Sequence, residues 1–422
     1  MQLNTLLDLD IVAVEAEDEV SVLLELAAPQ ADSQRTRAPA ALEIVLDRSG
    51  SMSGDRLEAA KGAIEALIDR LDPTDSFGLV VFDDEVQVAV PAGPLTDKEA
   101  VRRLVRGLDP GGMTNLSGGL MRGLQEVRRV SSKGSATVVL LSDGHANHGV
   151  TAAEALETIA AAGRARGVTT STVGIGLDYD ETLLAALSKG GAGNAHFAEE
   201  ADAAGAAVAS EIDGLLEQAA QACSLTVRPT GAVATVRLFN DLPVARIEGG
   251  FMVELGDFHS GEERKLLLTI DVPAMSALGL AEVCSLELQW VDAAKLDTHM
   301  VTIPVHVNVV PGDQAAGRIA NPTVRTEVAF QSAQRAKREA AEALRRGDAA
   351  EAARLYEGAG LALRGLGPLA APAMASEMEA EADLLSSLSL RASHDDPRRV
   401  AKFTEADRHR KARRRGGHDP KG

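Results

Sequence analysis

The spacing of hydrophobic residues between positions 40 and 200 alternates between two patterns. Short apolar runs of strand length are separated by longer stretches in which apolar residues recur every three to four positions, as on one face of a helix. The strands are predicted at residues 41–47, 76–82, 86–90, 136–142, 168–174 and 195–198. The helices between them are predicted at residues 55–71, 98–107, 115–130, 152–166 and 181–189. This alternation predicts a doubly wound α/β domain with a mostly parallel sheet.

Runs of strand character lie on both sides of this domain. Two of them precede it, and a helix expected near residues 202–223 leads into six more. These strands are predicted at residues 9–14 and 20–26, and then at 224–227, 233–238, 246–254, 263–272, 281–291 and 299–310. The first pair is too short to stand alone, so we expect it to join the later six in one β-sandwich, with the α/β domain inserted between them.

The strand pattern stops at Pro311-Gly312, and helical spacing follows. Residues 327–363 predict a helical hairpin broken at Gly347-Asp348, which resembles a single tetratricopeptide-like helix pair. A further helix at residues 373–390 could cover it, which gives a three-helix appendage, with a peptide-binding groove as the alternative. After His394 we expect a solvated basic tail. The expected divisions are residues 1–36, 37–217, 218–311, 312–393 and 394–422.

Composition places the chain among globular proteins. Of its 422 residues, 45% are hydrophobic and 25% charged, and no apolar run approaches the roughly 18 residues that a membrane span needs. The first ten residues have no basic segment and carry two acids, unlike a secretory signal, so we expect a cytoplasmic protein. The two cysteines, Cys223 and Cys284, both fall in strand-like runs and are expected to be buried thiols.

The distribution of charge argues against nucleic-acid binding. The formal net charge is −19, and aromatic residues are 3% of the chain, too few for a base-stacking platform. Residues 396–422 contain ten Lys and Arg against four Asp and Glu, a net of +6, which leaves −25 for the rest. A basic tail on an acidic body predicts self-contact or an acidic partner.

The candidate chemistry begins where the first strand of the α/β domain ends. Asp47, Ser49 and Ser51 follow the apolar run Ile44-Val45-Leu46, at the carboxyl end of a strand, where open α/β sheets bind ligands. One carboxylate and two hydroxyls suit a hard cation that keeps several waters, above all Mg²⁺. We expect Gly50 to let the loop turn tightly enough for the three side chains to face one point.

Two later segments supply matching oxygen atoms. Gly111-Gly112-Met113-Thr114 is a glycine turn that leads into a helix and presents the hydroxyl of Thr114. The buried run before Ser142 ends in Asp143, which a glycine follows. Each segment alone is a common turn, but all three together, in this order and each at a strand end or loop, are specific.

These residues resemble the von Willebrand factor A domain with a metal-ion-dependent adhesion site. The family pattern Asp-x-Ser-x-Ser, then Thr, then Asp is matched without departure, over roughly residues 40–217, by five residues: Asp47, Ser49, Ser51, Thr114 and Asp143. The residues around Thr114 and Asp143 also resemble those of bacterial members of this family. The resemblance implies that the serines, and Thr114 in one state, bind the metal directly, while one or both aspartates act through water. The metal is expected to be Mg²⁺, with Mn²⁺ or Ca²⁺ as alternatives.

This ligand set predicts a binding function and no enzyme. If one or both aspartates act through water, the directly bound protein ligands do not cancel the charge of the cation. An open coordination position could then take an Asp or Glu from a protein partner. The resemblance implies a partner such as an AAA+ ATPase of the MoxR type or another multi-protein assembly. The alternative is a scaffold that binds through its helical region and basic tail and uses the metal only for stability.

Other chemistry-bearing residues are weaker candidates. His145 and His148 lack a third ligand for a tetrahedral metal site, and Asp83-Asp84-Glu85 is expected to be a solvated hairpin turn. No Gly-x-Ser-x-Gly elbow or phosphate-binding loop is present, which argues against a hydrolase or an ATPase. Gly174-Ile175-Gly176 lacks the third glycine of a dinucleotide fingerprint.

Overall fold

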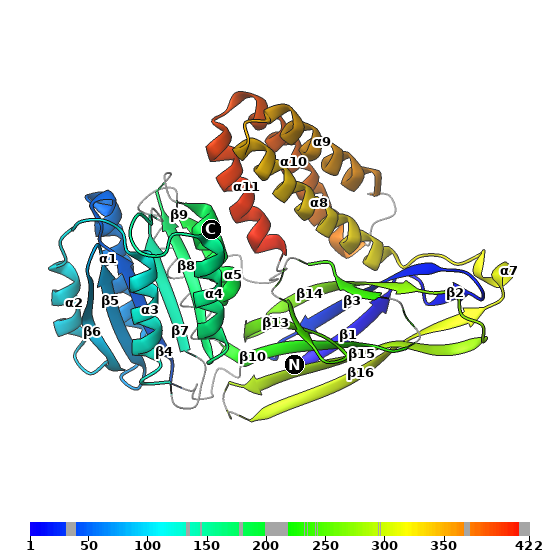
Figure 1. Cartoon of the computed structure of the whole chain (residues 1–422), viewed down its shortest axis with the longest axis horizontal. Helices are drawn as coiled ribbons and strands as arrows, with labels where there is room; N and C mark the ends of the chain where they lie inside the picture. The colour runs from blue at the N-terminus through cyan, green and yellow to red at the C-terminus, as the bar shows by residue number, and fades with distance from the viewer. Residues whose placement is uncertain are drawn as a thin grey trace.

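The structure, a computed structural model, describes residues 1–30, 39–131, 136–143, 146–176, 180–198, 218–231, 233, 235–240, 242, 244–293, 295, 297–366 and 372–412. Three parts are visible in Figure 1: an α/β domain, a β-sandwich and a helical domain that lies above both. No helix in these ranges has the length and hydrophobicity needed to cross a bilayer.

The α/β domain is built on a six-stranded sheet with the order β6-β5-β4-β7-β8-β9. All neighbouring strands are parallel except β5 and β6, which form an antiparallel hairpin. The strands are β4 (Ala41–Asp47), β5 (Ser76–Phe82), β6 (Val86–Pro94), β7 (Ala136–Ser142), β8 (Val168–Ile175) and β9 (Ala192–Ala198). The doubly wound fold predicted from the hydrophobic pattern is therefore confirmed.

Helices cover both faces of this sheet, and each face has its own core. The described helices are α1 (Asp55–Arg70), α2 (Lys98–Arg106), α3 (Leu116–Val127), α4 (Ala153–Arg164) and α5 (Glu181–Gly190). Side chains of α1 and α2 pack with Leu42, Ile44 and Leu46 of β4, whereas α3, α4 and α5 pack on the opposite face around Val45. The strand β4 is buried on both faces, as its apolar residues, interrupted only by Glu43, indicate.

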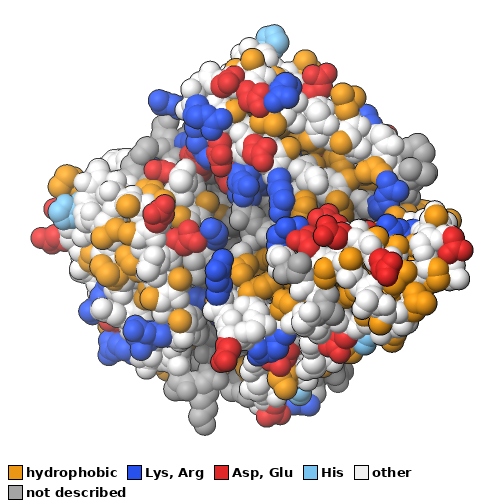
Figure 2. Space-filling view, turned by 45° about the vertical axis from the view of Figure 1, so that its right-hand side comes forward, with side chains coloured by type: hydrophobic (Ala, Val, Ile, Leu, Met, Phe, Trp, Pro, Cys, Tyr) orange, Lys and Arg blue, Asp and Glu red, His pale blue; other side chains and the backbone are white. Residues whose placement is uncertain are grey.

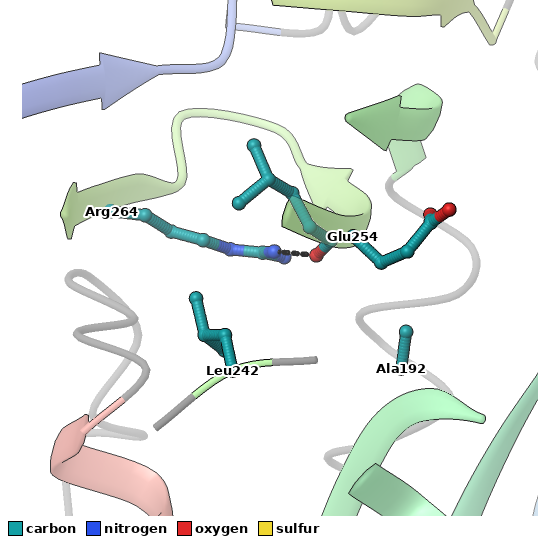
Figure 3. Close-up of a pocket in the computed structure, with 5 residues that line it drawn as sticks. Ala192, Leu242, Glu254 and Arg264 are labelled. Atoms are coloured by element: carbon teal, nitrogen blue, oxygen red, sulfur yellow. Dashed lines mark hydrogen bonds between the residues drawn. The ribbon is translucent and has the colours of Figure 1, made fainter. Parts of the chain in front are cut away.

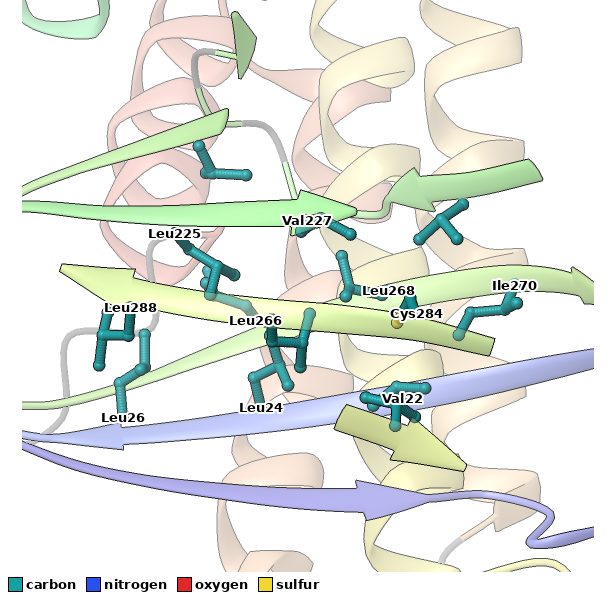
Figure 4. Packing of buried hydrophobic residues seen from close by; sticks show 14 of the residues in the cluster. Val22, Leu24, Leu26, Leu225, Val227, Leu266, Leu268, Ile270, Cys284 and Leu288 are labelled. Carbon is teal, nitrogen blue, oxygen red and sulfur yellow. The ribbon is translucent and has the colours of Figure 1, made fainter. Parts of the chain in front are cut away.

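The sandwich pairs a four-stranded sheet, β1-β3-β14-β11, with a six-stranded sheet, β12-β13-β10-β15-β16-β2. Its strands are β1 (Gln2–Leu7), β2 (Ile11–Ala13), β3 (Asp18–Ala27), β10 (Gln218–Pro229), β11 (Thr235–Leu238), β12 (Val244–Ile247), β13 (Gly250–His259), β14 (Glu263–Val272), β15 (Gly279–Asp292) and β16 (Thr298–Val310). Leu24 and Leu266 face Leu225 and Leu288 across the core, which also buries Cys284 (Figure 4).

The N-terminal strands belong to this sandwich. The register pairs Leu24 of β3 with Leu266 of β14, and β2 lies parallel to the end of β16. The α/β domain is thus inserted between β3 and β10. Both thiols are buried and free, and burial raises their pKa, that of Cys284 to about 12.

Several sequence-based boundaries differ from the structure. The strand β1 was not predicted, and the run at 246–254 is divided between β12 and β13 by a turn in which Gly249 has a φ of +73°. The helix expected near 202–223 is wrong from residue 218 onward, because β10 begins there. Its earlier part lies outside the described residues.

The helical domain consists of α8 (Pro322–Arg345), α9 (Ala349–Leu366), α10 (Ala375–His394) and α11 (Pro397–Ala412). The short helix α7 (Gly312–Ala315) precedes it. The expectation of a solvated tail after His394 is wrong for residues 397–412, which form α11. This helix is anchored by buried Val400 and Ala401, and Thr404 bonds the hydroxyl of Tyr356 at 2.8 Å. The charged face that suggests a tail in the sequence pairs instead with acids of the bundle.

Polar and apolar contacts join the three parts. Glu181 at the start of α5 pairs with Arg345 of α8 at 3.3 Å and with Lys402 of α11 at 3.9 Å. Between the α/β domain and the sandwich, the Thr169 hydroxyl donates to Asp257 at 3.3 Å. On the outer face of the four-stranded sheet, Val324 of α8 packs against Leu23 and Leu267.

Candidate metal centre

The five residues of the sequence motif lie at the carboxyl edge of the α/β sheet. Asp47 is the last residue of β4, and Asp143 follows the last residue of its parallel neighbour β7. From β4 the chain crosses to β5 on one side and later returns to β7 on the other. The two carboxylates therefore stand at a topological switch point, where crossover loops diverge and leave a crevice.

The Asp47 carboxylate is fully buried and held by two hydrogen bonds. Its Oδ1 accepts the Ser49 backbone N–H at 2.8 Å, and its Oδ2 accepts the Ser142 hydroxyl at 2.6 Å. Burial raises the pKa of Asp47 to about 6; the Ser142 and Ser49 hydrogen bonds oppose this rise, and the charge of Asp143 adds to it. A nearby cation would reverse this balance by stabilising the ionised form.

A short 3₁₀ turn, Gly50–Met52, follows β4; Ser51 lies within it and Ser49 directly precedes it. The two hydroxyls of Ser49 and Ser51 lie 3.1 Å apart, the first side chain buried and the second exposed. Met52 anchors the turn because its side chain is buried in the core beneath. The expected role of Gly50 is wrong: its φ is not positive, and the residue in the left-handed region is Gly54, which caps α1 with a φ of +78°.

The Thr114 loop is fastened to both neighbouring loops. The Gly50 N–H donates to the Gly112 carbonyl at 3.0 Å. On the other side, Asn147 accepts the Thr114 N–H at 2.8 Å through its side chain, and its own N–H donates to the Thr114 carbonyl at 3.2 Å. Thr114 is 1% exposed, and the helix α3 begins directly after it with Asn115 as its cap.

Asp143 is incompletely compensated. Its Oδ2 lies 3.4 Å from the Nη1 atom of Arg56, which also donates to the Ser51 carbonyl at 3.3 Å. Its Oδ1 is buried and has no hydrogen-bond partner within the described residues. A buried carboxylate oxygen without a partner costs free energy, so the site lacks a cationic or donor group on this side.

The donor atoms fit a hard divalent cation. They are two carboxylates and three hydroxyls, with no nitrogen or sulfur among the motif residues, the set that Mg²⁺ prefers. In the described ranges no three His, Cys, Asp or Glu side chains cluster as a transition-metal site would require. The orphaned Oδ1 of Asp143 is an acceptor atom that a bound cation would satisfy.

The weaker candidates from the sequence either have a structural role or lie outside the described residues. His145 lies outside the described residues, and His148 is an exposed residue whose backbone N–H donates to the Thr114 carbonyl at 3.2 Å. Asp83 pairs with Arg48 at 3.0 Å and accepts the Glu85 N–H at 2.8 Å, so it stabilises the turn between β5 and β6. Gly176 has a φ of +88°, and a Cβ there would meet Arg56 Nε at 2.7 Å.

Sequence reasoning missed three residues that shape the site: Ser142, Arg56 and Asn147. Ser142 precedes Asp143 in a buried run, and a hydroxyl in such a run was a readable signal because buried polar groups need partners. Arg56 and Asn147 gave no signal, since their contacts depend on loops brought together only by the fold.

Two of the cavities formed by the described residues lie outside this site. The smaller is lined by Ala192, Leu242, Glu254 and Arg264, where the α/β domain meets the sandwich, and holds about 10 Å³, roughly the space of one water (Figure 3). The larger, about 210 Å³, lies between the sandwich and the helical domain and is lined in part by Arg335, Arg338 and Arg408. Figure 2 shows Lys and Arg side chains gathered in the hollow below the helical domain.

Comparison with known proteins identifies the α/β domain. Residues 42–210 match the family model of the von Willebrand factor type A domain. The uncharacterized protein sll0103 of Synechocystis is 27% identical over 294 residues, 67% of this chain and 69% of the relative. The uncharacterized protein YfbK of Escherichia coli is 25% identical over 268 residues, and the match spans 47% of its length, about half.

A solved structure extends the likeness beyond this domain. A von Willebrand factor type A protein from Catenulispora acidiphila has a TM-score of 0.72 at 15% sequence identity, covering 92% of this chain and 96% of that one. At this identity the match concerns the fold alone. The chain contains a von Willebrand factor A domain, a domain that generally serves as a protein-interaction module and often binds a divalent metal.

Proposed function

We propose that the chain is a non-enzymatic, cytoplasmic interaction protein that binds Mg²⁺ at its von Willebrand factor A domain. The ligands would be five residues: Asp47, Ser49, Ser51, Thr114 and Asp143. When bound, Mg²⁺ supplies an electrophilic position that an Asp or Glu of a protein partner can fill. The observation that carries the proposal is the buried Oδ1 of Asp143, which has no partner within the described residues and which a cation would compensate.

The chain's own residues prepare this site in distinct ways. Ser142 and the Ser49 N–H orient Asp47, while Asn147 fixes the backbone of the Thr114 loop. Arg56, whose side chain is 30% exposed, lies beside Asp143 and partly balances its charge. The exposed hydroxyl of Ser51 stands at the rim, where a partner can approach.

The metal claim is tested by titrating the metal-free protein with Mg²⁺ in a calorimeter. We expect saturable binding by the wild type and none by Asp47→Ala. Asp313→Ala is the matched control, because Asp313 is an exposed carboxylate of the helix α7, outside the α/β domain, and should leave binding unchanged. Equal binding by all three proteins would refute the assignment, and Mn²⁺ and Ca²⁺ titrations would rank the ions.

The partner claim is tested by capture from the native lysate in Mg²⁺ and in EDTA. A protein recovered by the wild type in Mg²⁺, and lost both in EDTA and with Asp47→Ala, would support a metal-bridged contact. We propose an AAA+ ATPase of the MoxR type, or another multi-protein assembly, as the partner class. Recovery of the same proteins in every lane would contradict the bridge.

The second candidate function is a scaffold that binds through the helical region and basic tail. The 210 Å³ cavity beside α8 and α11 favours it, since three arginines line that cavity. Against it, Lys411 and Arg408 already pair with acids of the helical domain. Capture with Arg338→Glu as bait distinguishes the two: loss of a partner that Asp47→Ala retains would favour the scaffold.

A further inference from the structure

One long edge of the sandwich is open. The strand β16 forms the outer side of the six-stranded sheet, at the lower border of the domain in Figure 1. β2 pairs with it only over residues 308–310. In the part of the chain that the structure describes, no strand pairs with the outer side of residues 298–307.

Successive residues of a strand direct their backbone N–H and C=O groups to opposite sides, which shows which groups face outward along this edge. The Asn308 N–H donates to the Asp10 carbonyl at 2.8 Å, and the Val310 carbonyl accepts the Val14 N–H at 2.8 Å. Even-numbered residues therefore direct their N–H and C=O groups away from β15. Met300 and Thr302 present both groups to an incoming strand, whereas Pro304 stands at an outward position and has no N–H to donate.

Residues 298–303 of this edge lack the usual protection against pairing, and Pro304 guards only the part of the strand that follows them. Natural edge strands are guarded by charge, by proline or by short length. Residues 298–312 contain no Asp, Glu, Lys or Arg, and residues 298–302 are all exposed, Met300 at 60%. The opposite edge of the same sheet, β12, follows the rule, since it has four residues and one of them is Arg246.

We propose that residues 298–302 of β16 pair antiparallel with the same residues of a second copy of this chain, with Met300 opposite Met300 at the two-fold axis. An isologous interface must be complementary to itself, which an uncharged strand satisfies in a chain of net charge −19. A two-fold axis generates the antiparallel arrangement that already joins β15 and β16. Pairing also closes the edge, so the assembly stops at a dimer, and Pro304 limits the length of the contact.

The test measures the mass of the full chain by sedimentation as a function of protein concentration. We expect the wild type to shift from one copy to two as concentration rises. Thr302→Pro should weaken the dimer at least about tenfold, because it removes an outward N–H from each copy. Thr302→Val is the matched control that keeps the N–H, and it should dimerise like the wild type. An outward N–H is not part of the β15 ladder, so both variants should fold.

Two further measurements separate this surface from others. Amide exchange of the peptide that contains residues 298–302 should slow as the dimer forms in wild type and not in Thr302→Pro. Added salt should tighten the dimer, because it screens the repulsion between two acidic chains, and EDTA should have no effect. A dimer unaffected by Thr302→Pro would overturn the proposal. A monomer at every concentration would also overturn it, leaving the edge to a strand of another protein.

Discussion

Two groups of buried charges, one in the helical domain and one in the α/β domain, are compensated in different ways. In the helical domain, fully buried Lys337 pairs with Glu381 and with Asp407, the latter at 2.6 Å, and Lys411 pairs with the same two acids at 2.6 and 3.1 Å. The two cations balance the two anions. At the candidate metal centre, Asp143 pairs with the half-buried Arg56, and one of its oxygens has no partner within the described residues; Asp47 is held by hydrogen bonds from Ser49 and Ser142.

The two groups also differ in the direction in which the pKa values of their acids are shifted. Burial raises the pKa of Glu381 and Asp407, yet the charges of Lys337 and Lys411 outweigh it and hold both pKa values below their usual range. The helical cluster is complete without any added group. Asp47, by contrast, has a raised pKa, so its carboxylate lacks a stabilising charge. The acids of the helical cluster are therefore compensated within the chain, whereas Asp47 is not.

The largest expected effect comes from breaking the complete cluster. Lys337→Met leaves Glu381 and Asp407 facing each other with only Lys411 between them, and should lower the free energy of unfolding by about 3–5 kcal/mol. Denaturant unfolding followed by circular dichroism measures this loss. Lys411→Met is the control with a smaller expected loss, because that side chain is 25% exposed. A loss below about 1 kcal/mol for Lys337→Met would contradict the assignment of a structural role.

Removing a charge from the candidate metal centre should not lower the free energy of unfolding of the metal-free protein. Asp143→Asn should weaken Mg²⁺ binding by about 100-fold or more, while the stability of the metal-free protein stays equal or rises, because an uncompensated buried charge is removed. Calorimetric titration and thermal unfolding in EDTA measure the two quantities. If the metal-free variant were destabilised as strongly as Lys337→Met, the two clusters would not differ in kind.

The sequence pointed to the candidate metal centre and gave no sign of the helical cluster, for a physical reason. The five motif residues lie at strand ends or in the loop before a helix, where a local pattern marks the position of each side chain. The cluster depends on α11 packing against α8, and nothing local distinguishes Lys337 from a solvated lysine. The same limit explains why residues 397–412 were expected to be a solvated tail. The alternation in β1 is broken by Thr5 and by the adjacent Leu6 and Leu7, which explains why it was not predicted.

A third buried acid, Glu43, extends the comparison, because it has no hydrogen-bond partner within the described residues and no ligand is proposed for it. Glu43 of β4 is fully buried, both its oxygens lack hydrogen-bond partners in the described part of the chain, and Gly78 leaves room for its carboxyl group. Burial, and next the charge of Glu126, raise its pKa to about 9, although Arg122 opposes them. Glu43 is therefore expected to be protonated at neutral pH.

A raised pKa in the folded state gives stability that is complete below the unfolded pKa and is lost as pH rises through the folded value. Glu43→Gln removes this titration and should stabilise the protein by about 2 kcal/mol at neutral pH. Unfolding free energies of both proteins, compared between about pH 5 and pH 9, should converge on the acid side. A difference that does not change with pH would show that Glu43 is not protonated.

The smallest expected effect is the pH dependence of metal binding through Asp47. Because the cation requires the ionised carboxylate and the metal-free pKa of Asp47 is about 6, Mg²⁺ affinity should fall about tenfold between pH 7 and pH 5. Calorimetry across this range measures it. Ser142→Ala removes the hydrogen bond that lowers this pKa, so its midpoint should move to higher pH. A midpoint below pH 5, unchanged by Ser142→Ala, would mean that Asp47 is already compensated without the cation, as the acids of the helical cluster are.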